Sequence, residues 1–240
     1  MSDEFTITDP DLDEDRRRYQ APFSSADFDA MFSEIAQETV DAQPGLLDQL
    51  RELSTPARVG LGVGSGLAAG GVVLTILGIR GDLADGGMLM ASVLLGTAAM
   101  GGLSVAVSLR GMHQRPLGSA AWLIVGLALL SPLALAAVPG LWPGEPAPFM
   151  MPWQSGCFWF GSAVAVASAS VVALLQRSAS PPLWRVFTAA GAGGCAGFVV
   201  QQLFCPANDL WHQVTAHGFL GLLAGAFLLT MLRIRELSRP

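Results

Sequence analysis

Six long apolar stretches without an Asp, Glu, Lys or Arg follow one another between residues 59 and 232, and they constrain the fold more than any other feature. The hydrocarbon core of a bilayer is ~30 Å thick, so a helix needs about 20 apolar residues to cross it. Six such segments cannot all lie inside a soluble protein, because too few other residues remain to cover them. The sequence therefore predicts an all-α, six-helix transmembrane bundle. The expected spans are Val59–Ile79, Met88–Leu109, Ala120–Val138, Ser155–Leu175, Val186–Phe204 and Gln213–Leu232.

The arginines predict the orientation of this bundle. All 13 basic residues are arginine, and near the membrane nine of them fall on one side of the predicted bundle while only Arg80 falls on the other. Positively charged residues stay on the cytoplasmic side. We therefore expect a multi-pass protein of the bacterial inner membrane with both termini in the cytoplasm. The nine arginines are Arg51, Arg58, Arg110, Arg115, Arg177, Arg185, Arg233, Arg235 and Arg239.

The 58 residues before the first span form an acidic head. They hold 14 acidic and 5 basic residues, a net charge of −9 within a chain whose total is −6. Nucleic acid and anionic lipid headgroups would repel such a head, whereas a basic protein surface would attract it. Direct nucleic-acid binding is therefore not expected. We divide the chain into a disordered acidic tail (1–22), a cytoplasmic amphipathic helical segment (23–58), the membrane domain (59–232) and a cytoplasmic tail (233–240).

Two short helices in the head each carry one apolar face. In the first helix the apolar residues recur at positions i, i+3, i+4 and i+7, the pattern of helices that bind in a groove of another protein. About 30 residues cannot build a stable core on their own, so these faces need a partner. A partner protein, the chain's own cytoplasmic loops and the lipid surface are the alternatives. The residues predicted to make the contact are Phe28, Met31, Phe32 and Ile35, followed by Leu46, Leu47, Leu50 and Leu53.

The predicted spans contain few ionisable side chains. Their only ionisable groups are His217 and the thiols of Cys157 and Cys195, which argues against ion channels and pumps, because those proteins commonly carry charged residues in the membrane. The chain has none of the HExxH, GxSxG or Walker motifs, so we do not expect an enzyme. Transport of a neutral solute remains open.

Glycine is abundant in the spans instead of charge. Gly193 with Gly197, and Gly221 with Gly225, form two GxxxG patterns, which allow helix backbones to approach closely in lipid. The same pattern serves contacts within one chain and between chains. A homo-oligomer is therefore also possible.

One group of residues carries metal-ligand chemistry. In the predicted topology Cys157, Cys205, His212 and His217 all fall near the outer ends of spans four, five and six. Thiolate and imidazole are ligands for zinc and copper. Cys157 and Cys205 could equally form a disulfide in an oxidising compartment or act as a thiol sensor. Plain packing of all four residues is the remaining alternative.

Parts of the chain resemble a known family. The run QLFCPANDLWHQVTAH (202–217) and the run GCFWFG (156–161) resemble the two cysteine motifs of the NrsF family of bacterial membrane anti-sigma factors, and LLDQLREL (46–53) resembles its leucine-rich cytoplasmic segment. The resemblance covers most of residues 46–240, whereas the longer acidic head departs from it. Myxobacterial carotenoid regulators, which are also membrane anti-sigma factors, share this general plan.

The resemblance implies a function that the residues alone do not. A chain of this family would sequester an extracytoplasmic-function sigma factor through its cytoplasmic segment and release it on a signal. It would thus repress transcription, for example of carotenoid genes. Cys157 and Cys205 would be the sensing residues, and the signal could be a metal, an oxidant or light. The alternatives are a membrane metal-handling or thiol-dependent protein that uses the Cys/His group, and a neutral-solute transporter.

Overall fold

The structure is a computed structural model that describes residues 30, 33, 45–111, 117–138, 140–142, 156–178 and 181–238. The chain divides into two units, Met1–Gly45 and Leu46–Pro240. The predicted 23–58 segment is therefore split between them, and its leucine-rich part belongs to the membrane unit. The predicted contacts of Phe28, Met31, Phe32 and Ile35 lie outside the described residues, as does the predicted disorder of residues 1–22.

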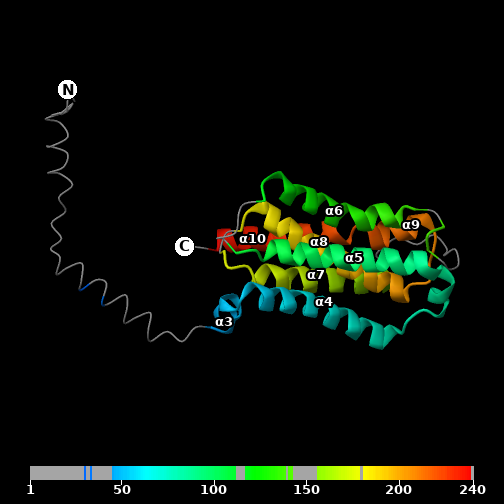
Figure 1. The fold of residues 1–240 in the computed structure, drawn as a ribbon, viewed down its shortest axis with the longest axis horizontal. Coiled ribbons are helices and arrows are strands. Elements are labelled where there is room, and N and C mark those ends of the chain that lie inside the picture. Colours follow the sequence, from blue (N-terminus) through cyan, green and yellow to red (C-terminus); the bar gives the residue numbers. More distant parts are fainter. Residues whose placement is uncertain are drawn as a thin grey trace, which may run out of the picture. The chain divides into compact units, whose positions relative to one another are not determined.

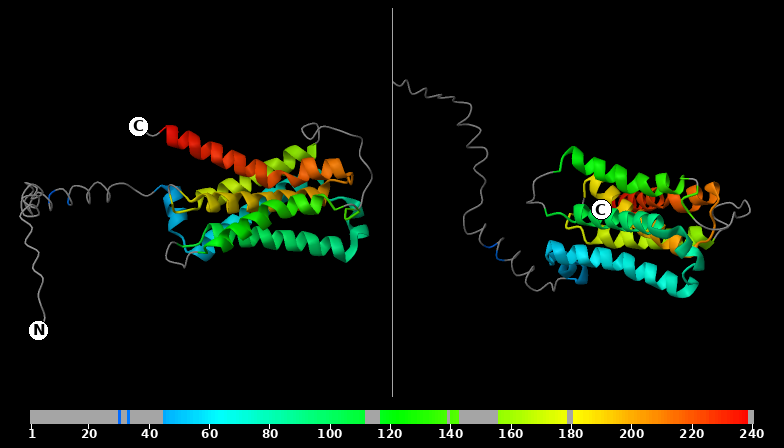
Figure 2. Two further views of the ribbon diagram at one scale, coloured as in Figure 1. Left: turned by 90° about the horizontal axis from the view of Figure 1, so that it is seen from above. Right: turned by 45° about the vertical axis from the view of Figure 1, so that its right-hand side comes forward.

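The second unit is a bundle of helices, six of which are long and apolar enough to cross a membrane (Figures 1 and 2). The predicted all-α architecture with six spans is confirmed for the described residues, while the orientation of the termini stays a prediction. The helices are α3 (Leu46–Glu52), α4 (Thr55–Leu77), η1 (Gly81–Gly86), α5 (Gly87–Ser108), α6 (Ser119–Ala136), α7 (Gly156–Leu174), α8 (Leu183–Phe204), α9 (Leu210–His212), η3 (Gln213–Gly218) and α10 (Leu220–Leu237). The sixth span joins α9, η3 and α10.

The first span begins earlier than the apolar pattern predicts. The side chain of Ser54 accepts a hydrogen bond from the backbone N–H of Ala57, and Pro56 occupies the first turn. Both features favour a helix start, since serine satisfies a free N–H group and proline has none to lose. Helix α4 thus begins at Thr55 rather than at Val59, and brings Arg58 into its first turn.

Helix α8 is the centre of the bundle and contacts α4, α5, α6, α7 and α10. Of the apolar span in α8, 67% is buried inside the protein, whereas only 17% of the span in α4, at the periphery, is buried. The glycines of its GxxxG pattern make this position possible. A Cβ atom at Gly193 would lie 2.2 Å from the carbonyl oxygen of Ala165, and one at Gly197 would lie 2.7 Å from that of Gly161. The predicted close packing is confirmed, and here it serves contacts within one chain.

Large apolar side chains cover the outside of the bundle. Met88 is 88% exposed and Leu67 is 73% exposed, and many other leucines and valines of the spans are also exposed. Soluble proteins rarely expose contiguous apolar surface of this extent. The outer surface of the described bundle therefore suits lipid.

One end of the bundle is held together by arginine. The buried guanidinium group of Arg58 donates hydrogen bonds to the carbonyl oxygens of Leu53 (3.2 Å), Leu175 (3.1 Å) and Leu109 (3.3 Å) and to the hydroxyl of Thr55 (3.1 Å). Leu175 and Leu109 directly follow α7 and α5, whose last carbonyl groups lack partners within the helix. Arg58 therefore ties the start of α4 to the ends of two neighbouring helices. We call this the arginine end; its described arginines are Arg51, Arg58, Arg110, Arg177, Arg185, Arg233 and Arg235.

Helix α3 is fastened to the same end. Arg177 donates to the carbonyl oxygens of Arg51 (2.8 Å), Glu52 (3.2 Å) and Leu53 (3.2 Å). Arg51 and Glu52 are the last two residues of α3, and Leu53 directly follows it. In return, Nε of Arg51 donates to the carbonyl oxygen of Leu174 at the end of α7 (3.0 Å). Basic side chains at a helix C-terminus satisfy such carbonyls and complement the helix dipole. The α3 helix is thus attached directly to α7.

Candidate metal centre

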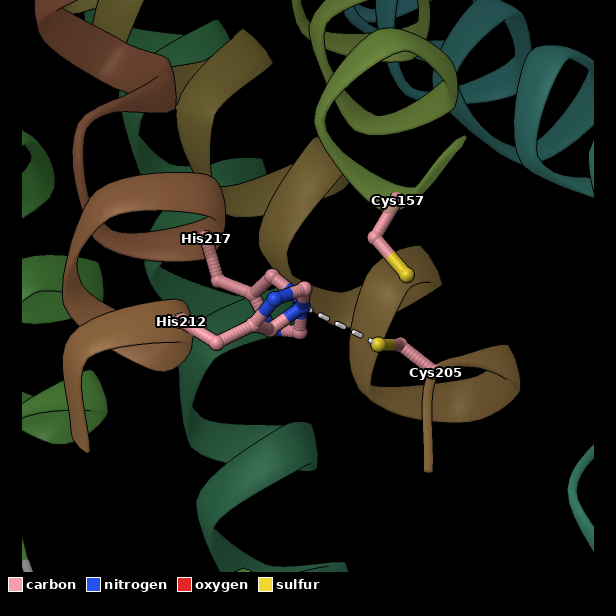
Figure 3. Close-up of side chains that lie close together, drawn as sticks. All are labelled: Cys157, Cys205, His212 and His217. Carbon is pink, nitrogen blue, oxygen red and sulfur yellow. Dashed lines mark hydrogen bonds between the residues drawn. The ribbon is translucent and has the colours of Figure 1, made fainter. Parts of the chain in front are cut away.

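Four side chains converge at the opposite end of the bundle, and we call them the Cys/His centre (Figure 3): Cys157, Cys205, His212 and His217. Their ligand atoms, two sulfurs and one nitrogen from each imidazole, all lie within 4.8 Å of one another. Cys205 and His217 are buried, and the other two are half-buried. The sequence predicted this group as a candidate, and the structure brings all four members together.

The two cysteines are placed by the ends of neighbouring helices. Cys157 lies in the first turn of α7, and Cys205 directly follows α8. The backbone N–H of Cys205 still donates to the carbonyl oxygen of Gln201 (2.8 Å), so the thiol is held in a fixed place at the end of this helix. Pro206 comes next and, having no N–H group, cannot continue the pattern. The three cysteines of the chain are free thiols in the structure.

An irregular helix aligns the two histidines. In an α-helix of 3.6 residues per turn, residues five apart point about 140° away from each other. Here α9 passes into η3, a π-helix, so His212 and His217 share one face, with their ring centroids 5.1 Å apart. The carboxylate of Asp209 accepts from the backbone N–H of His212 (2.8 Å) and so caps this segment. π-Helices are rare and occur frequently at functional sites.

A glutamine network lies behind His217. Nε2 of Gln202 lies 3.0 Å from Nδ1 of His217 and 2.6 Å from Oε1 of Gln213, whose own amide nitrogen donates to the carbonyl oxygen of Ala207 (2.5 Å). All three side chains of this network, those of Gln202, Gln213 and His217, are buried. Within the described part of the chain, Oε1 of Gln202 and Nε2 of His217 have no hydrogen-bond partner. The network therefore fixes the ring through its Nδ1 atom.

A second glutamine connects the helices of the centre. Nε2 of Gln201 donates to the carbonyl oxygens of Cys157 (2.5 Å) and Ala216 (3.0 Å), and thereby links α8 to α7 and to η3. A Cβ atom at Gly161 would lie 2.0 Å from this amide nitrogen, so only glycine leaves room for it. Gln201 therefore sets the distance between Cys157 and the histidine segment.

Arg80 supports the centre from the connection after α4. It donates to the carbonyl oxygen of Cys205 (2.7 Å), and its backbone N–H donates to that of Leu203 (2.9 Å). The same guanidinium group pairs with the carboxylate of Asp82. The chain's single arginine on this side of the predicted membrane thus holds the turn that carries one of the thiols.

The donor set fits a thiophilic metal ion. The pKa of the Cys205 thiol lies below its usual range, mainly because the Cys157 thiol donates a hydrogen bond to it. His212, whose Nε2 lies 3.3 Å from Sγ of Cys205, adds to this effect, while burial opposes it. A thiolate is the form that binds metal. Two sulfurs and two imidazole nitrogens match the ligands of tetrahedral zinc, and copper also accepts them.

The amide of Gln202 decides whether His217 is a ligand. As oriented, this amide donates to Nδ1, which leaves the ring hydrogen on Nε2, the nitrogen without a partner. A half-turn of the amide would let its oxygen accept from Nδ1–H and free the lone pair of Nε2 for a metal. Because the same amide nitrogen donates to Oε1 of Gln213 (2.6 Å), the Gln213 amide would have to turn with it. Metal-bound histidines usually donate their other N–H to such an oxygen.

The predicted partner-binding leucines differ in exposure. In and directly after α3, Leu46, Leu47 and Leu53 are 72%, 43% and 37% exposed, whereas Leu50 packs against the core of the bundle. Cys195 is buried mid-span, where its thiol lies 3.6 Å from the carbonyl oxygen of Ala128, away from the Cys/His centre. The sequence did not predict Arg80, the glutamines or the π-helix as parts of the site. The signals available were a lone arginine on the arginine-poor side and adjacent glutamines at the end of a span.

Comparisons with known proteins add no assignment to this geometry. No family model, curated protein or solved structure matches the chain.

Proposed function

We propose that this chain is a membrane-bound anti-sigma factor of the bacterial cytoplasmic membrane. Its N-terminal segment would hold an extracytoplasmic-function sigma factor in the cytoplasm, and a signal at the Cys/His centre would release it. Metal ions, oxidants and light-generated oxidants are signals to which thiolate and imidazole ligands respond. The genes controlled would then include stress or carotenoid genes. The protein would repress transcription without touching DNA.

One observation carries this proposal: helix α7 makes contact with both functional parts of the chain. Its first turn contains Cys157. At its other end the carbonyl oxygen of Leu174 accepts a hydrogen bond from Arg51, and that of Leu175, directly after the helix, accepts one from Arg58. Arg177, three residues after α7, donates to the end of α3. A shift of α7 at the Cys/His centre would therefore be felt directly at the base of the head.

The binding surface follows from exposure and charge. Leu46, Leu47 and Leu53 offer apolar area on or beside a short helix, and the head adds a net charge of −9 over residues 1–58. Apolar anchors supply affinity, while complementary charge accelerates encounter with the basic surface of a DNA-binding protein. Release requires only a moderate change in affinity. Coupling between sites is typically ~1–3 kcal/mol.

The test is binding of the full-length protein to a sigma factor encoded beside its gene. We expect the two to co-purify from membranes, and the double substitution Leu46→Asp with Leu47→Asp to abolish this and to switch on a sigma-dependent reporter. Phe32→Asp should act in the same direction. Leu237→Asp is the matched control, since Leu237 is 81% exposed at the end of α10. Co-purification that survives the double substitution as well as the control would refute this binding surface.

The Cys/His centre also supports a second candidate, a membrane metal-handling or thiol-dependent protein. Four soft ligands in one place can bind zinc or copper without any regulatory partner. Bound metal combined with turnover of a substrate or transport of the ion into vesicles, and no sigma factor bound, would favour this candidate. Metal binding that changes sigma-factor affinity would favour the first.

A further inference from the structure

A groove opens between α7, α8 and α10 at the arginine end. Its volume is about 350 Å³, and its wall is mostly apolar, with Val186 from α8 and Phe227, Leu228 and Met231 from α10. Sites for small ligands usually measure ~300–1,000 Å³, so the groove has room for part of a lipid chain. It belongs to neither the Cys/His centre nor the exposed leucines of α3.

The rim of this groove is basic and polar. Arg51 and Arg235 line it, together with Ser170, Ser178 and Gln176, and none of the described residues that line it is acidic. Arg51 pairs with the carboxylate of Asp48 on its own helix at 3.6 Å, and that carboxylate is 62% exposed. The rim therefore concentrates positive charge at the end of the apolar groove.

Gln176 fixes the wall of the groove. Its amide nitrogen donates to the hydroxyl of Ser108 at the end of α5 (2.7 Å) and to the carbonyl oxygen of Arg185 in α8 (3.1 Å). The side chain is only 2% exposed, and its buried Oε1 has no partner among the described residues. Gln176 therefore ties the wall of the groove to two other helices and does not itself face a ligand.

We propose that this groove binds an anionic phospholipid of the adjacent leaflet. The acyl chain occupies the apolar part, and the phosphate lies between Arg51 and Arg235, as in other basic pockets between membrane helices. A soluble anion lacks the tail, and a zwitterionic lipid lacks the net charge. Because Arg51 belongs to α3, a bound lipid would steady the helix that leads into the head, whatever that head binds.

The test uses the full-length protein in nanodiscs of phosphatidylcholine with a small fraction of spin-labelled phosphatidylglycerol. We expect phosphatidylglycerol to be immobilised preferentially over labelled phosphatidylcholine. A basic residue near an anionic headgroup contributes roughly a fivefold preference. Arg235→Gln should therefore reduce the preference about fivefold. Arg233→Gln is the control: it removes the same charge from the same helix, but Arg233 pairs with Glu236 and does not line the groove.

A second variant separates the groove from general surface charge. Ala173→Leu would fill the groove without changing any charge, so it should release the immobilised lipid while the thermal transition of the protein stays close to that of the wild type. Equal immobilisation of both lipids would overturn the proposal, and so would equal losses in Arg235→Gln and Arg233→Gln. A groove covered by a second copy would also overturn it, and would appear as a dimer whose stability is independent of phosphatidylglycerol.

Discussion

The two ends of the bundle are tied together by different side chains. Helices that end inside protein leave their last carbonyl groups without a partner in the helix. At the arginine end, Arg58 and Arg177 donate to such carbonyl groups with guanidinium groups. At the Cys/His centre, the guanidinium group of Arg80 does this for Cys205 after α8, and a neutral amide adds the cross-links, since Gln201 donates to the carbonyl oxygens of Cys157 and Ala216.

The two ends also differ in whether their side chains can change chemically. A guanidinium group keeps its charge under all physiological conditions, so the arginine end has one state. Thiols and imidazoles bind metals, become oxidised and change protonation, so the Cys/His centre has several. We infer that any signal enters at the Cys/His centre and that the arginine end transmits it without changing chemically.

The strongest test of this comparison is removal of one thiol. Cys205→Ser should abolish stoichiometric zinc binding, because Cys205 is the thiol held by both Cys157 and His212 and hydroxyls replace thiolates poorly. Metal analysis of the purified protein and a competition titration with a chromogenic chelator measure this. Cys195→Ser is the matched control, since it makes the same change at a buried thiol outside the centre. Zinc binding that survives in Cys205→Ser would remove the Cys/His centre as the metal site.

A second test concerns the glutamine behind His217. Gln202→Leu removes the amide that faces Nδ1 of His217 at 3.0 Å, while keeping an apolar side chain of similar length. Loss of an outer partner of a metal ligand typically weakens binding ~10–100-fold. We expect that weakening for zinc by the same titration. Gln176→Leu changes a buried glutamine at the other end and should leave zinc affinity unchanged; equal effects of both substitutions would mean that the network acts through general stability.

The sequence predicts the spans well because their signal is simple. Apolar length and the absence of charge fix six segments, and five of the six begin within three residues of the spans found, for example Ala120 against Ser119. The predicted and observed helix ends differ most where polar groups determine the end of a helix. The cap at Ser54 starts α4 four residues early, and α10 continues to Leu237 although Arg233 and Arg235 end the apolar run.

The site is only partly predictable, for a physical reason. Cys157, Cys205, His212 and His217 could be placed near one rim from topology alone, because span ends meet there. Periodicity of 3.6 residues places His212 and His217 on different faces, and only the π-helix aligns them. Likewise Leu50 repeats with Leu46 in the sequence, yet it faces the bundle core. Which face of a short helix is covered depends on tertiary contacts that the pattern does not contain.

Removing the buried arginine tests the holding role of the other end. Arg58→Gln removes the donor to two carbonyl groups, that of Leu109 after α5 and that of Leu175 after α7, and each unsatisfied buried group costs ~1–3 kcal/mol. We expect a lower thermal transition of the protein in detergent but unchanged zinc affinity in the fraction that remains folded. Arg233→Gln, on the exposed surface of α10, should change neither. A loss of zinc affinity in folded Arg58→Gln would show that the two ends are not chemically separate.

The smallest expected effect tests whether a change at the Cys/His centre reaches α3. Arg177→Gln removes the donors to the end of α3 at an exposed position, so we expect ~0.5–1 kcal/mol of local destabilisation and an opening of α3 that is a few-fold more frequent. Hydrogen exchange of the amides of Leu46–Glu52 would report this, with little change elsewhere in the bundle. Zinc added to the wild type should also change exchange in α3, because α7 joins both places. In Cys205→Ser zinc should have no such effect, and a zinc response of α3 that persists there would mean that the signal reaches the head by a route other than the Cys/His centre.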